Sequence, residues 1–167
     1  MRVLFLCLTL TSGCAITLAQ ANHPNDPLTK FKSQGASAVA AEKAREKHDP
    51  CRVPQSLSDQ IPCTHDELDR TKKNYLQLAR AVGGLLRLHN SDDDADRKIN
   101  IGGDFDAAES AWAKYKDAQC EVVADEYPHA EDAPHGQALA TLSCELAVTR
   151  QHIYELNVVY GWLWTSK

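Results

Sequence analysis

The 167-residue sequence predicts an all-α protein, a small disulfide-stapled helical bundle of three main helices with a possible fourth at the N-terminus. The first observation behind this prediction is that apolar residues recur every three to four positions in three long segments, the period of an amphipathic helix. The second is that four cysteines follow the apolar N-terminal segment, enough for two disulfides. The third is that the intervening segments are rich in Pro, Gly, Asn and Asp, which favour turns.

Residues 1–21 have the layout of a secretory signal peptide, with a basic residue, an apolar run and then Ala19-Gln20-Ala21. This layout predicts cleavage after Ala21 and a periplasmic or secreted bacterial protein. One alternative is an N-terminal membrane anchor, which Thr, Ser and Gly within the run disfavour. A second alternative is an outer-membrane lipoprotein lipidated on Cys14, although Thr11 stands where a lipoprotein box usually has Leu.

The overall charge is moderately acidic. Removing residues 1–21 removes Arg2 and no acidic residue, so the formal net charge changes from −5 to −6. This sign argues against nucleic acid as a partner. It favours encounter with a basic protein, although the same charge also serves solubility.

Residues 22–50 are expected to be a leader or linker that contains a possible helix. The stretch 22–35 is rich in Pro, Asn and Gly, whereas 36–48 is rich in Ala, Glu and Lys and has high helix propensity. The apolar face of this helix is mostly alanine, so loose docking is expected. The main domain is expected over residues 51–167.

Three prolines and two cysteines predict a loop or short turns over residues 49–63, where a bridge between Cys51 and Cys63 would close a small ring. The next helix is expected over 65–89, with Thr64 and Glu67 in a capping-box pattern. Gly83-Gly84 inside it weakens the helix or marks a close helix contact. The predicted apolar stripe of this helix comprises Leu68, Tyr75, Leu78, Ala79, Val82, Leu85 and Leu86.

The segment 90–104 is predicted to be an acidic, solvated loop. Its acidic residues include Asp92, Asp93, Asp94 and Asp96. Their spacing partly matches a calcium-binding loop, but the required turn glycine is replaced by an arginine and the bidentate acid by a glycine, so calcium is not expected.

A helix is expected from Asp106 to about residue 127, followed by a turn with two prolines. Its predicted stripe comprises Phe105, Ala108, Trp112, Tyr115, Gln119 and Val122 or Val123. Two histidines, His129 and His135, flank acidic residues in the turn, but no rigid element fixes them, so no metal site is expected.

The last helix is expected over 137–160. Its predicted stripe comprises Leu139, Leu142, Leu146, Thr149, Ile153, Leu156 and Val159. After it, Trp162 and Trp164 either pack on the bundle or offer an exposed aromatic patch.

The four cysteines allow three pairings. Helices 106–127 and 137–160 are joined by a short turn, so they are expected to be antiparallel neighbours. Cys120 and Cys144 lie at similar distances from that turn, which permits a bridge between them and leaves Cys51 with Cys63.

The motifs of residues 51–160 resemble the LprI-like lysozyme inhibitor family, and the second half is the more specific part. The matching residues are Cys51, Cys63, Glu67, Leu68, Asp69, Tyr75, Trp112, Tyr115, Asp117, Ala118, Cys120, Cys144, Thr149, Arg150 and Leu156. The chain departs from the family pattern at Lys116, where the family usually has arginine, and in the acidic loop, which is often shorter.

The resemblance implies an exported binding protein that blocks a basic lysozyme. The acidic loop (Asp92, Asp93, Asp94, Asp96) and the turn with His129 and His135 are the candidate partner contacts. The alternative is an envelope interaction protein without this activity. No cofactor or catalytic residue is predicted, because the sequence has no nucleophile elbow, phosphate loop or zinc motif, and charges such as Lys116, Asp117 and Arg150 near a helix seam are more often ion pairs.

Overall fold

The computed structural model describes residues 26–48, 50–52, 56–93, 100–126 and 133–166. These residues form five α-helices, one short 3-10 turn and no strand, so the predicted all-α class is confirmed. The helices are α1 (Pro27–Lys47), α2 (Leu57–Asp93), α3 (Ile101–Asp125), α4 (Ala133–Tyr160) and α5 (Trp162–Thr165), and the 3-10 turn is η1 (Pro50–Arg52).

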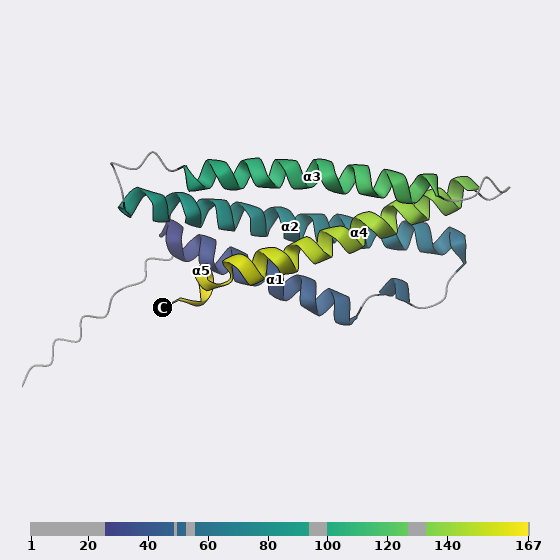
Figure 1. Cartoon of the computed structure of the whole chain (residues 1–167). Coiled ribbons are helices and arrows are strands. Elements are labelled where there is room, and N and C mark those ends of the chain that lie inside the picture. Colours follow the sequence, from purple (N-terminus) through teal and green to yellow (C-terminus); the bar gives the residue numbers. More distant parts are fainter. Residues whose placement is uncertain (1–25, 49, 53–55, 94–99, 127–132, 167) are drawn as a thin grey trace, which may run out of the picture.

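Helix α2 is the centre of the bundle, because it packs against α1, α3 and α4 (Figure 1). Helices α3 and α4 form an antiparallel pair that meets at one end of the molecule, and the start of α1, the end of α2 and α5 gather at the other end. The buried core comprises Ala38, Val39, Leu78, Val82, Leu85, Leu86, Phe105, Ile153, Leu156 and Leu163. It therefore draws side chains from all five helices.

Helix α1 is longer and better docked than the sequence suggested. It begins at Pro27, after Asp26, whose carboxylate accepts a hydrogen bond from the backbone N–H of Thr29 at 3.1 Å. A capping acid followed by proline at the first helical position is a strong start signal, so the leader predicted over 22–35 is wrong for residues 27–35. The ring of Phe31 lies against Gly84, where a Cβ atom would approach it to 2.6 Å, which confirms a close helix contact at the glycine pair.

Helix α2 begins at Leu57, so the loop predicted up to Cys63 is wrong for residues 57–63. Pro62 lies inside the helix, in its second turn, and cannot donate a backbone hydrogen bond to the carbonyl four residues before it. The backbone carbonyl of Ser56 accepts from Asp59 and Gln60, and the helix start is tied to η1 by a disulfide. The capping-box interpretation is also wrong, since Thr64 and Glu67 lie buried within the helix.

The loop predicted over 90–104 is wrong at both ends, because α2 continues to Asp93 and α3 starts at Ile101. The side chain of Asn100 caps α3 by accepting from the N–H of Gly103 at 3.0 Å. Gly102 is buried against Arg87, where a Cβ atom would lie 2.5 Å from the arginine Cγ. Gly102 thus allows α3 to approach α2.

Helix α4 starts at Ala133, one turn earlier than predicted, with Pro134 in a first-turn position that tolerates proline.

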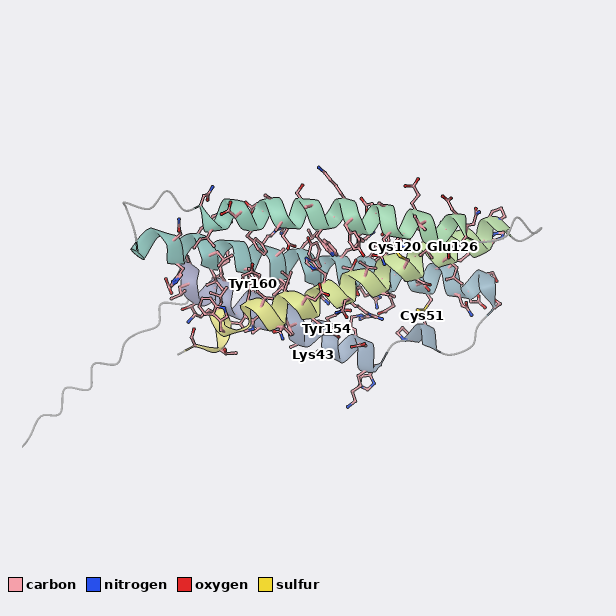
Figure 2. All side chains as sticks on the ribbon, in the orientation of Figure 1. Lys43, Cys51, Cys120, Glu126, Tyr154 and Tyr160 are labelled. Carbon is pink, nitrogen blue, oxygen red and sulfur yellow. A yellow bond between two sulfur atoms is a disulfide. The ribbon has the colours of Figure 1, made fainter. Side chains whose placement is uncertain are left out.

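Two disulfides brace the bundle. Cys51 pairs with Cys63 and Cys120 with Cys144, at Cα–Cα distances of 5.8 and 5.5 Å. This is the pairing that the hairpin geometry permits, and Figure 2 labels Cys51 and Cys120 toward the end where α3 meets α4.

The predicted apolar stripes have different outcomes. The stripe of α2 is buried or partly buried throughout. In α3 the buried residues are Gly102, Phe105 and Cys120, whereas Ala108, Tyr115, Gln119 and Val122 are exposed. In α4 the stripe is confirmed except at Val159, which is exposed. An apolar part of α3 and α4 therefore faces solvent.

Candidate protein-binding face

Two buried carboxylates join α1, α2 and α4 at the centre of the molecule. Glu42 and Glu67 are 0% and 1% exposed. Arg150 lies between them, with its Nε atom 2.8 Å from Glu42 and its Nη2 atom 3.4 Å from Glu67. Glu67 also accepts from Arg45, and Glu42 accepts from Asn74 and Thr71 at 2.8 Å each. Buried charges need such pairing, so this cluster fixes α1 to the remaining helices.

A second cluster joins α2, α3 and α4. The Tyr75 hydroxyl donates to Glu109 at 2.9 Å, and the Nε2 atom of His152 lies 3.1 Å from both oxygens of the same carboxylate. The ring of Trp112 stacks on His152 with centroids 3.9 Å apart and an interplanar angle of 11°. Burial raises the pKa of the Tyr75 phenol, and so do the charge of Glu109 and the hydrogen bond from Tyr75 to Glu109.

A third site is a shallow hollow of about 460 Å³ on the outside of the α3–α4 pair. Its lining residues are Trp112, Tyr115, Gln119, Ala147, Val148, Gln151 and Glu155. Tyr115 is 61% exposed, and Val122, about two turns further along α3, is 58% exposed. We call Tyr115, Val122 and these lining residues the α3–α4 face. An exposed aromatic and apolar face of this kind is typical of protein-binding surfaces.

Lys116, Asp117 and Arg150, which the sequence led us to expect in ion pairs, do not form one shared polar site. The Nζ atom of Lys116 lies 2.5 Å from Asp117, which is largely exposed, and 3.9 Å from Glu145. Arg150 belongs instead to the buried carboxylate cluster. These residues form structural ion pairs.

The family-motif residues fall mostly inside the fold. Leu68 and Thr149 are buried, and Tyr75, Trp112 and Arg150 belong to the two clusters above. Asp69 is exposed beside His65, and Tyr115 and Ala118 face solvent. Most of the motif thus describes the scaffold and not a contact surface.

The predicted partner contacts remain predictions. Asp92 and Asp93 lie in the last turn of α2, and His135 is exposed in the first turn of α4. Asp94, Asp96 and His129 lie outside the described residues. In the described part of the chain, no three His, Cys, Asp or Glu side chains are grouped as a metal site would require.

The C-terminal tryptophans have different environments. Trp164 packs on Gly35 of α1, where a Cβ atom would lie 3.0 Å from its ring, whereas Trp162 is 52% exposed. Trp162 lines a second hollow with Leu28 and His89 at the end of the bundle where α1 begins. Across the described ranges, none of the helices has both the length and the apolar character of a membrane span.

Sequence reasoning missed Glu42, Glu109 and His152, on which both buried clusters depend. Glu42 lies in a segment expected to dock loosely, and Glu109 lies in the first turn of the helix expected from Asp106. A signal existed for His152, because it follows Thr149 by three residues and so lies next to the predicted buried stripe of its helix.

The fold and these sites define a disulfide-braced, all-α binding domain in which the polar motif residues support the scaffold. The sequence model of the family described as "Lysozyme inhibitor LprI" matches residues 54–156, and the chain belongs to this family. Its members are classed as inhibitors and not as enzymes. Neither the curated proteins nor the solved structures gave a match. The two disulfides and the family together indicate an extracytoplasmic protein.

Proposed function

We propose that this protein inhibits a basic lysozyme by binding to it. Membership of a lysozyme inhibitor family is the observation that carries the proposal. The net charge of −5 supports it, since an acidic protein is steered toward a basic one at long range. Lysozymes cleave glycans with two carboxyl groups in a cleft, so an inhibitor needs only to obstruct access to that cleft.

The rigid scaffold supports inhibition by binding. Two disulfides and two buried polar clusters hold the helices in place before any partner arrives. Little conformational freedom is then left to lose on association, which favours affinity. We propose that the acidic loop around Asp94 and Asp96 and the turn around His129 and His135 assist the encounter.

The test is a turbidity assay of egg-white lysozyme on bacterial cell walls, with and without the purified protein, at low and at moderate ionic strength. Inhibition at micromolar protein that weakens steeply with added salt is expected. Full lytic activity at low salt would refute the proposal.

A matched pair of variants tests the acidic loop. Asp94→Asn with Asp96→Asn should weaken inhibition at low salt. The control, Asp59→Asn with Asp66→Asn, changes the net charge equally on exposed positions at the other end of α2. If both pairs of substitutions weakened inhibition equally, the net charge of the protein would account for the effect and the acidic loop would make no specific contribution.

We also propose that the chain is exported to the periplasm or the medium by cleavage after Ala21, with a lipid on Cys14 as the alternative. Intact-mass measurement of the mature protein separates the two. Cleavage after Ala21 leaves Asn22 as the first residue, whereas lipidation leaves a modified cysteine at the N-terminus.

A second candidate function is an envelope interaction protein that does not inhibit lysozyme. The hollow shared by exposed Trp162 and Leu28 favours it, because both offer apolar surface at one end of the bundle. Absence of inhibition together with specific capture of an envelope protein, lost in Trp162→Ser, would support this alternative.

A further inference from the structure

The residues that define the α3–α4 face include no lysine or arginine. Among the residues that line its hollow, the one charged side chain is the carboxylate of Glu155. At the other end of the face, Asp125 and Glu126 are exposed and follow Val122 by three and four residues, so they lie on the same side of α3. Figure 2 labels Glu126 at the end of α3 that meets α4.

The centre of the face has the composition of a binding hot spot. Tyr115 and Val122 project from α3, and Ala147 and Val148 lie across the seam on α4. Aromatic anchors surrounded by a polar rim contribute most of the binding energy in protein complexes. An apolar centre with an acidic rim complements a partner whose surface is apolar at the contact and basic around it.

Two contacts between α3 and α4 hold the α3–α4 face rigid. The bridge between Cys120 and Cys144 joins the two helices, one residue from Gln119 and three from Ala147. The stack of Trp112 on His152 fixes the seam at a second point, about two turns away along α3. Both helices therefore present the face without rearrangement.

We propose that the α3–α4 face, with Tyr115 and Val122 at its centre, is the surface that docks onto the basic lysozyme. The assignment rests on the proposed function and goes beyond it, because it places the contact on the helices and not on the acidic loop. The occupant is a basic protein, since the face offers carboxylates and apolar groups but no cation for an acidic one.

The experiment compares two substitutions that add the same charge. Val122→Lys places an ammonium group at the centre of the face, and Leu76→Lys places one on α2, in a different hollow beside Gln34 of α1. Both wild-type side chains are about half exposed, so neither change opens a cavity in the core. Tyr115→Ala removes the aromatic anchor without changing charge.

The dissociation constant for egg-white lysozyme is measured at one low ionic strength, and thermal melting confirms that each variant is folded. We expect Val122→Lys and Tyr115→Ala each to raise the dissociation constant at least about tenfold. Leu76→Lys should change the dissociation constant less than about threefold, because a solvent-exposed charge far from the contact has little effect on binding.

The outcomes distinguish the two proposals. Wild-type binding that Val122→Lys and Leu76→Lys weaken equally, or that Tyr115→Ala leaves unchanged, overturns the docking face and leaves the proposed function standing. A wild-type protein that does not bind the lysozyme overturns the proposed function, and the docking face with it.

Discussion

Replacing Arg150 by methionine is expected to destabilise the fold severely. Arg150 is the cation nearest to Glu42, whose carboxylate is fully buried and lies 2.8 Å from the arginine Nε atom. The other hydrogen-bond donors to Glu42 are the neutral side chains of Thr71 and Asn74. Methionine keeps much of the apolar stem of arginine, so the change mainly removes charge and hydrogen bonds.

The structure sets the expected magnitude. Glu67 retains its pair with Arg45, so Arg150→Met leaves one buried carboxylate, that of Glu42, without a cation. Breaking a buried pair from one side costs about 3–5 kcal/mol. For a domain of this size, that cost lowers the melting temperature by about 6–20 °C.

Urea denaturation followed by circular dichroism measures the free energy of unfolding. Arg70→Met is the matched control, because Arg70 is half exposed and lies 3.7 Å from Glu67, and its loss should cost less than about 1 kcal/mol. Glu42→Gln combined with Arg150→Met should cost clearly less than the sum of the single changes. Additive costs, or an Arg150→Met protein as stable as the control, would refute the assigned ion pairing.

Three further predictions concern packing, pH and the disulfides. Gly84→Ala should destabilise the protein by about 1–3 kcal/mol, because the added Cβ would meet the ring of Phe31. Gly83→Ala should be tolerated, because the nearest atom is the flexible end of Arg87. Thermal melting of both variants tests this difference. The raised pKa of Tyr75 means that its contribution to stability is complete below about pH 10, where an unfolded tyrosine ionises, and is lost at higher pH. Alkaline melts should therefore show a steeper loss in wild type than in Tyr75→Phe. Replacing Cys120 and Cys144 together by alanine should cost about 2–4 kcal/mol in chemical denaturation, and an unchanged midpoint would contradict a stabilising bridge.

Much of the fold could be predicted from the sequence because helical periodicity is a local property. The stripe from Leu68 to Leu86 fixed the buried face of α2, and the turn after α3 made Cys120 and Cys144 neighbours. Boundaries were less predictable where proline and glycine occur at helix ends. Pro62 and Gly102 suggested loops, yet each is accommodated near the start of a helix.

The docking of α1 could not be predicted because it depends on tertiary ion pairs. Its apolar face is poor, as expected, but Glu42 meets Arg150, which is 108 residues away in the chain. The exposure of Tyr115 and Val122 was missed for a related reason. Helix α3 contacts its neighbours through a strip that includes Phe105, Trp112 and Cys120, and this strip is narrower than the apolar pattern suggested.

The most direct test of the central claim is a calorimetric titration of egg-white lysozyme with the purified protein at low ionic strength, with lytic activity measured on the same mixtures. The account predicts a saturable complex and a loss of activity that follows the bound fraction. Absence of binding at micromolar concentrations, or a complex that keeps full lytic activity, would contradict it.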